Sequence, residues 1–246
     1  MKSILRNCLH YNDIFLAKEN DRSGISKFII KSSSSEIGIN VIKNELNGIE
    51  WYNNQGVKKL SILVEKEMPE YLRTKCLFIP GLIHPYEQGF SKNEKYIKLI
   101  IDHYCEIWPK SHSKNDLYSL HGDLSMCNVI FNRSQIPIII DWEHFNLYSA
   151  PLGFDALNLL FEQTWIEYEI THNIDKIIIN LVSIIQSLRN QNAIDKIFLE
   201  SPLNKTINFI NENSNLWGEQ YKKLPILNFD DGLINQIDEM INKIQN

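Results

Sequence analysis

Side chains that bind protons or metal ions gather in the stretch 120–145, which reads LHGDLSMCNVIFNRSQIPIIIDWEHF. Asp123 stands before an apolar run, Asn128 begins that run, and Asp141 ends the next one. Carboxylate and amide oxygens are the ligands that Mg²⁺ prefers, and a further carboxylate beside such a site can act as a base. The pattern therefore predicts a magnesium site with a neighbouring general base.

Two short strands would position these groups. Residues 129–131 and 136–140 are apolar, and Pro137 lies near the start of the second run, where a missing N–H is tolerated. The four residues 132–135, Asn-Arg-Ser-Gln, have the chemistry of a chain-reversing turn. We expect an antiparallel hairpin that brings Asp123 and Asp141 to the same edge.

The spacing His121-x-Asp123-x(4)-Asn128, followed by Ile-Asp-Trp-Glu at 140–143, resembles the aminoglycoside phosphotransferase and choline kinase family of small-molecule kinases. Turn capping would explain each residue singly but not the joint spacing. The resemblance implies a two-lobed, protein kinase-like α+β fold. Residues 1–80 would form a small antiparallel sheet with one helix, as the nucleotide-binding lobe, and residues 81–246 a larger, mainly helical lobe with the acceptor pocket.

The resemblance also implies the reaction, which is transfer of the γ-phosphoryl group of ATP to a hydroxyl of a small molecule. Asp123 would accept the proton of that hydroxyl, and Asn128 and Asp141 would hold Mg²⁺. Lys31, at the end of Phe-Ile-Ile-Lys, stands where the family places the lysine that binds the α- and β-phosphates. Its glutamate partner would be Glu45.

The predicted elements around these residues follow from turn signals and periodicity. Residues 13–31 read as a β-hairpin, and the isoleucines and leucine within 37–54 recur at helical spacing up to a stop at Gly56. We expect strands at 60–64 and 76–79, separated by a charged turn over 65–74. In the resembled family the edge after the second strand meets adenine, which would place Phe78 and Ile79 at the base.

Further helices are expected in the second half of the chain. Asp155 is expected to cap the helix that follows it and to support the loop at Asp123. Helical periodicity continues over 96–108, 174–188, 194–198, 205–213 and 231–244.

One departure from the family pattern keeps a second interpretation open. The family carries a glycine-bearing phosphate loop near the N-terminus, whereas residues 6–12, Arg-Asn-Cys-Leu-His-Tyr-Asn, contain no glycine. A non-catalytic pseudokinase that binds nucleotide or a partner is therefore the alternative, disfavoured by the joint presence of Asp123, Asn128 and Asp141. A metal-dependent hydrolase using His121 and Asp123 is a weaker alternative, because no second histidine cluster lies nearby.

Composition narrows the class of partner. The net charge of −5 and pI near 5.8 argue against a nucleic-acid partner. The four cysteines show neither C-x-x-C spacing nor a paired rhythm, and the apolar runs are too short and interrupted for a signal peptide or membrane span. We expect a cytoplasmic protein.

The charge distribution suggests what the acceptor is. Residues 144–246 carry 13 acidic against 7 basic side chains, and the resembled family builds its acceptor pocket from this region. A pocket lined by one sign of charge concentrates ligands of the other. We therefore expect a neutral or cationic alcohol, such as a sugar, an amino sugar or an amino alcohol, with Glu162, Glu167 and Glu169 as candidates for lining the pocket.

Overall fold

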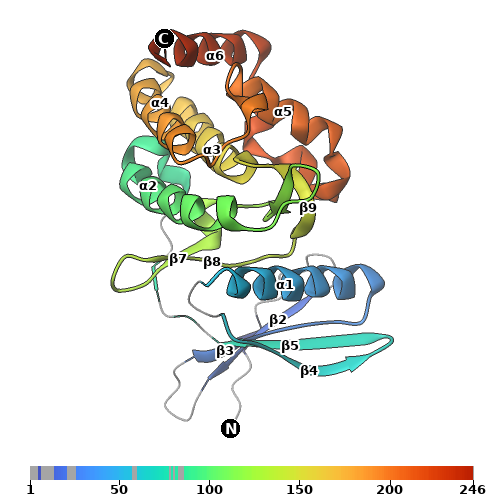
Figure 1. The fold of residues 1–246 in the computed structure, drawn as a ribbon. Coiled ribbons are helices and arrows are strands. Elements are labelled where there is room, and N and C mark those ends of the chain that lie inside the picture. Colours follow the sequence, from blue (N-terminus) through green and yellow to red (C-terminus); the bar gives the residue numbers. More distant parts are fainter. Residues whose placement is uncertain are drawn as a thin grey trace. The chain divides into compact units, whose positions relative to one another are not determined.

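The computed structural model describes residues 5–6, 14–20, 26–56, 60–77, 79, 81–82 and 86–245. The chain divides into two compact units, and each combines two stretches of sequence. Unit 1 comprises Met1–Gly81 with Ile140–Phe145, and unit 2 comprises Leu82–Ile139 with Asn146–Asn246. Figure 1 labels their helices and strands.

Unit 1 contains a five-stranded antiparallel sheet in the order β1-β2-β3-β5-β4. Its strands are β1 (Leu5–Arg6), β2 (Phe15–Asn20), β3 (Ser26–Ser33), β4 (Ile62–Met68) and β5 (Tyr71–Leu77). The predicted hairpin is confirmed as β2 and β3, and Lys31 of the central strand β3 lies opposite Leu16 on one side and Thr74 on the other. Lys31 therefore sits where backbone pairing fixes the strand from both sides.

Helix α1 (Glu36–Asn54) lies across one face of this sheet and contacts β3 and β5 (Figure 1). Its start is set by Ser35, whose side chain accepts a hydrogen bond of 3.0 Å from the N–H of Gly38. Ile39, Ile42 and Ile49 are buried at the predicted helical spacing. The predicted stop is also confirmed, because Gly56 adopts the left-handed backbone that ends helices, with φ +81°.

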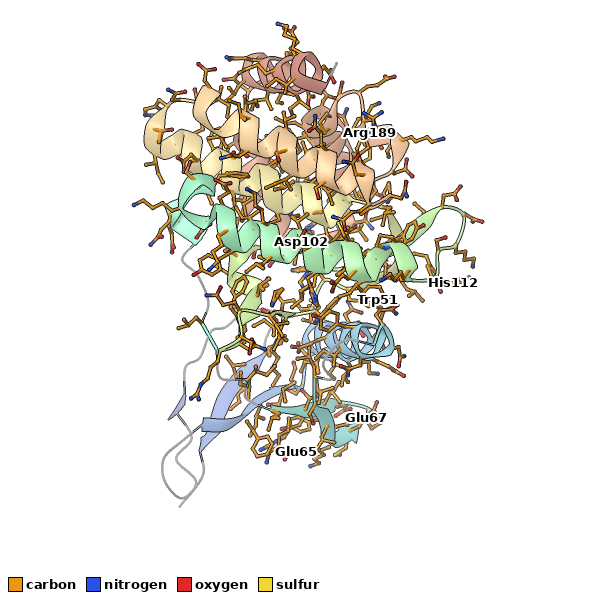
Figure 2. The ribbon with its side chains drawn as sticks, turned by 60° about the vertical axis from the view of Figure 1, so that its left-hand side comes forward. Trp51, Glu65, Glu67, Asp102, His112 and Arg189 are labelled. Carbon is orange, nitrogen blue, oxygen red and sulfur yellow. The ribbon has the colours of Figure 1, made fainter. Side chains whose placement is uncertain are left out.

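The prediction of a turn over residues 65–74 is wrong. Strand β4 continues to Met68, and only two residues separate it from β5. The charges that suggested a turn belong to an edge strand, which pairs on one side only and so tolerates exposed charged side chains. Glu65 forms a 2.7 Å ion pair with Arg73 of β5, and Figure 2 shows Glu65 and Glu67 at this strand.

Unit 2 is mainly helical. Its longer helices are α2 (Phe90–Ile107), α3 (Phe154–Thr171), α4 (Asp175–Asn190), α5 (Pro202–Glu212) and α6 (Asp231–Gln245). Helix α3 contacts α2, α4 and α5, and every residue from Phe154 to Phe161 is buried. The helix expected at 194–198 is instead a short 3-10 turn at Lys196–Phe198. In the part of the chain that the structure describes, no helix has the length and apolarity to cross a membrane.

Two small antiparallel sheets complete unit 2. Strand β6 (Leu117–Leu120) pairs with β9 (Asn146–Pro151), and β7 (Val129–Phe131) pairs with β8 (Pro137–Ile139). The second pair is the hairpin expected from the sequence, with Val129 opposite Ile139. The loop that carries Asp123 and Asn128 connects β6 to β7.

Candidate functional site

The loop between β6 and β7 holds Asp123 through its own backbone and through Asn128. The Asn128 side-chain N–H₂ donates to both the carbonyl and the Oδ2 of Asp123, each at 2.8 Å. The Asp123 N–H points at Nδ1 of His121 at 3.2 Å. The predicted base and the first predicted metal ligand are therefore direct neighbours in unit 2, and the Asp123 carboxylate has a defined direction.

Asp155 fixes the start of this loop from α3. Its Oδ2 accepts a 2.9 Å bond from the N–H of His121, and its Oδ1 accepts a 3.0 Å bond from the N–H of Gly122. The expected support of the loop is thus present, but the expected helix cap is wrong. Gly153 is the N-cap residue of α3 and makes no side-chain cap bond, while both Asp155 oxygens are engaged by the loop.

Burial raises the pKa of Asp155 to about 7, although the two N–H donors oppose this by stabilising the carboxylate. The charge of Asp123 pushes in the same direction as burial. The group that accepts the bonds from His121 and Gly122 therefore changes between its protonated and ionised forms near pH 7.

Glu162 lies two helical turns beyond Asp155 and is electrostatically coupled to Asp123. Its Oε2 is buried and has no hydrogen-bond partner among the described residues. Burial raises the pKa of Glu162 to about 8, and the negative charge of Asp123 adds to the effect. Of the other two predicted acidic residues, Glu167 is buried and accepts a 3.2 Å bond from the N–H of Ser91, and Glu169 is exposed. Of the three glutamates predicted to line the acceptor pocket, Glu162 is therefore the one that we place in the electrostatic surroundings of Asp123.

The second group of predicted site residues lies in unit 1. Lys31 Nζ is 2.9 Å from Oε1 of Glu45 and 2.7 Å from Oδ1 of Asp141. Lys31 is on β3, Glu45 is on the buried face of α1, and Asp141 lies in the segment Ile140–Phe145. A strand, a helix and a distant segment of the sequence therefore converge on one ammonium group.

The charges of this group are strongly interdependent. Burial disfavours the cationic form of Lys31, but the charges of Glu45 and Asp141 outweigh this, so the pKa of Lys31 is raised. Burial pushes the pKa of Glu45 upward and Lys31 opposes it. Lys31 thus stays positively charged, with Glu45 fixing its direction.

Aromatic packing on α1 places Asp141. Trp142 is fully buried, and its ring centroid is 5.7 Å from that of Trp51 and 5.1 Å from that of Tyr52. A Cβ added at Gly48 would lie 2.6 Å from Cβ of Trp142, so only glycine allows this approach. Figure 2 marks Trp51. Asp141 itself has φ 61°, a left-handed conformation that Asp and Asn adopt more readily than most residues.

The structure says little about the remaining predictions for the nucleotide site, which concern Phe78, Ile79 and the glycine-free loop. Phe78 lies outside the described residues, as do residues 7–12 of the glycine-free loop. Ile79 is partly buried just beyond the end of β5. Contact of Phe78 and Ile79 with adenine stays a prediction.

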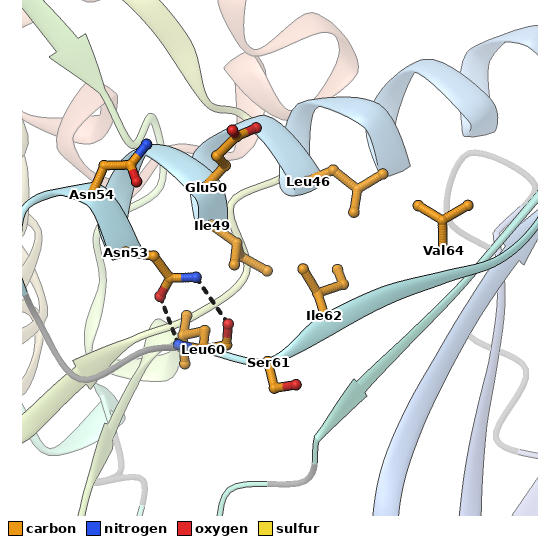
Figure 3. A pocket seen from close by; sticks show the side chains of 9 residues that line it. All are labelled: Leu46, Ile49, Glu50, Asn53, Asn54, Leu60, Ser61, Ile62 and Val64. Carbon is orange, nitrogen blue, oxygen red and sulfur yellow. Dashed lines mark hydrogen bonds between the residues drawn. The ribbon is translucent and has the colours of Figure 1, made fainter.

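A hollow of about 670 Å³ lies between α1 and β4 (Figure 3). Its walls are largely apolar, including Leu46, Ile49 and Ile62. Asn53 at one end bonds the backbone N–H and C=O of Leu60, at 2.7 and 2.9 Å. None of the predicted site residues lines it.

The predicted metal ligands match the donor preference of Mg²⁺. Both N–H groups of the Asn128 amide are directed at Asp123, which leaves its carbonyl oxygen as the atom suited to a metal. Asp141 supplies a carboxylate. Among the described residues, no three His, Cys, Asp or Glu side chains cluster as a metal cage. A Mg²⁺ ion that takes its other oxygens from phosphate and water needs no such cage.

One residue in contact with the loop was missed by sequence reasoning. Trp217, beyond α5, donates a hydrogen bond from its indole to the Gly122 carbonyl. Its only signal in the sequence is that it is the single tryptophan after Trp165.

The antiparallel sheet with α1 and the helical unit together form a kinase-like mixed α/β fold. The comparison that shows this is with the solved structure of an ethanolamine kinase from Plasmodium vivax, which has a TM-score of 0.58 and 13% sequence identity over 99% of this chain and 82% of that one. No family model and no curated protein sequence matches the chain. The likeness therefore concerns the fold.

Proposed function

We propose that this protein is an ATP- and Mg²⁺-dependent phosphotransferase that moves the γ-phosphoryl group to a hydroxyl of a small molecule. The observation that supports this most directly is the Asp123 carboxylate, held by the Asn128 amide on a loop that Asp155 fixes. Phosphoryl transfer depends on positioning and charge neutralisation more than on covalent chemistry. A rigidly held carboxylate meets the first of these demands.

In this proposal Asp123 orients the acceptor hydroxyl and accepts its proton as the oxygen attacks. Lys31 binds the nucleotide phosphates, and Glu45 keeps its ammonium group directed and charged. Asn128 and Asp141 hold Mg²⁺, which neutralises negative charge on the phosphate oxygens. The joint presence of all five side chains favours an active enzyme over a pseudokinase.

For the acceptor we propose a cationic amino alcohol. The Oε2 of Glu162 is buried without a hydrogen-bond partner among the described residues, and the negative charge of Asp123 disfavours its ionised form. An ammonium group on the acceptor would offset the negative charge of Asp123 and favour the ionised form of Glu162 when it binds. The structural neighbour is an ethanolamine kinase, which agrees with this class of acceptor.

The test is an ATP-consumption assay with choline, ethanolamine, an amino sugar, a neutral sugar and a sugar acid, with each product identified by mass. Asp123→Asn should reduce turnover by about 10² to 10⁴ and leave ATP affinity nearly unchanged. Asp116→Asn is the matched control, because Asp116 is exposed and precedes β6. ATP binding without turnover of any acceptor would favour the pseudokinase, and turnover confined to sugar acids would contradict the charge argument.

A further inference from the structure

Trp217 makes a buried contact with the loop that carries Asp123. It lies between two 3-10 segments, Ser214–Leu216 and Gly218–Lys223, and is 2% exposed. Its Nε1–H donates to the Gly122 carbonyl at 2.6 Å, across 95 positions of sequence. Its ring packs near Phe154, the first residue of α3, at a centroid distance of 5.8 Å. The indole therefore has both a hydrogen-bond partner and an aromatic neighbour.

This bond acts on one particular peptide plane. The Gly122 carbonyl and the Asp123 N–H belong to the same planar peptide unit and point in opposite directions. Trp217 holds the carbonyl edge, and Nδ1 of His121 lies 3.2 Å from the nitrogen at the other edge. Fixing both edges fixes the rotation of the plane, and the next atom along the chain is the Cα of Asp123.

As a glycine, Gly122 restrains its own backbone little. Its φ is 85°, in the left-handed region that glycine enters freely, so its backbone is intrinsically permissive. Its N–H is held by Asp155 and its carbonyl by Trp217. The direction of the Asp123 side chain therefore depends on tertiary bonds made at the preceding residue, in addition to its own bond with Asn128.

We propose that Trp217 is a positioning residue for Asp123. It orients the Asp123 carboxylate by anchoring the Gly122 carbonyl. This inference rests on the proposed role of Asp123 as the base. Trp217 is buried and touches the loop backbone, so it acts through Asp123. Its loss should lower the rate of transfer more than the affinity for ATP.

The chain offers a matched control in Trp108. Its Nε1–H donates to the Ser119 carbonyl at 2.8 Å, and the side chain is 1% exposed. Trp217→Phe and Trp108→Phe each keep an aromatic ring and leave one buried carbonyl without its indole donor. The two bonds differ in that Ser119 lies within β6, before the loop begins. If the role of Trp217 is merely structural, the two variants should show similar changes in kcat, in melting temperature and in amide exchange of the loop.

The experiment measures kcat, the KM for ATP, the melting temperature and amide hydrogen exchange of peptides covering residues 119–128 in both variants. We expect similar falls in melting temperature. Only Trp217→Phe should lose kcat, by about 10- to 100-fold, with the KM for ATP within about twofold of wild type. Faster exchange of the amides of residues 121–123 should likewise be confined to Trp217→Phe.

Equal losses of kcat in the two variants would overturn the proposal, as would unchanged exchange at residues 121–123 in Trp217→Phe. The exchange measurement separates this proposal from the proposed function. If the wild type turns over no acceptor, the kinase proposal fails, and loop exchange that is faster in Trp217→Phe than in Trp108→Phe still supports anchoring by Trp217.

Discussion

Replacing Glu162 by Gln should make the protein more stable at alkaline pH. The wild-type carboxyl group has a pKa raised from 4.5 to about 8, first by burial and then by the charge of Asp123. The folded state therefore binds a proton more tightly than the unfolded state does. Stability contributed by this proton is complete below pH 4.5 and is lost as the pH rises toward 8. Glutamine fills the same space with no charge to lose.

The size of the effect follows from the same shift. One pKa unit corresponds to about 1.4 kcal/mol, so the full shift makes the wild type lose roughly 4 kcal/mol relative to Glu162→Gln between pH 5 and pH 9. The side chain as a whole is only partly buried, although its Oε2 is shielded. Water therefore screens part of the charge, and we expect a difference of about 2 kcal/mol.

Urea denaturation at pH 5, 7 and 9 measures this difference. Glu169→Gln is the control, since Glu169 lies on the same helix and is exposed. Because choline keeps its charge at every pH, its KM should fall from pH 7 to pH 9 as Glu162 ionises, and Glu162→Gln should remove that trend. Parallel stability curves for wild type and Glu162→Gln would refute the reasoning about burial, whatever the assay of turnover shows.

Two further predictions concern unit 1. Asp141→Asn should weaken Mg²⁺-dependent ATP binding at least about tenfold in calorimetry, because one carboxylate supplies much of the protein's hold on the ion. Asparagine is chosen because it tolerates the φ of 61° at this position. Affinity equal to wild type would show that Asp141 does not bind the metal. Gly48→Ala should destabilise the protein by about 1–3 kcal/mol in urea denaturation, because its methyl group meets Trp142. The exposed Asn47→Ala is its control, and equal stability of the two variants would contradict the close packing at Gly48.

The sequence predicted correctly those elements whose limits depend on neighbouring residues in the chain. The spacing of isoleucines in α1 and the glycine after it gave a helix with correct limits, because one periodicity sets which face is buried. Lys31 and Glu45 were assigned to one another through the family resemblance, and the structure does bring them to 2.9 Å. Their catalytic roles stay proposals.

Other features depended on neighbours that no local pattern reveals. The charges of β4 read as a turn because sequence alone does not say that this strand is at an edge. Asp155 has the composition of a helix cap, yet its oxygens are taken by the loop before Asp123. Trp217 reaches Gly122 from a part of the chain without any motif. In each case a tertiary partner outweighed the local preference.

The division of the chain has a consequence for how the protein is made. Unit 1 is discontinuous, since its segment Ile140–Phe145 is synthesised after α2 and both strands of the β7–β8 hairpin. Trp51 and Tyr52 receive their packing partner Trp142 only from that segment. Domains commonly fold in order as they leave the ribosome. Here unit 1 cannot complete its aromatic core until the segment Ile140–Phe145 has been synthesised. A fragment ending at Gly81 would lack Trp142 beside those rings, so we expect it to aggregate or to recruit chaperones.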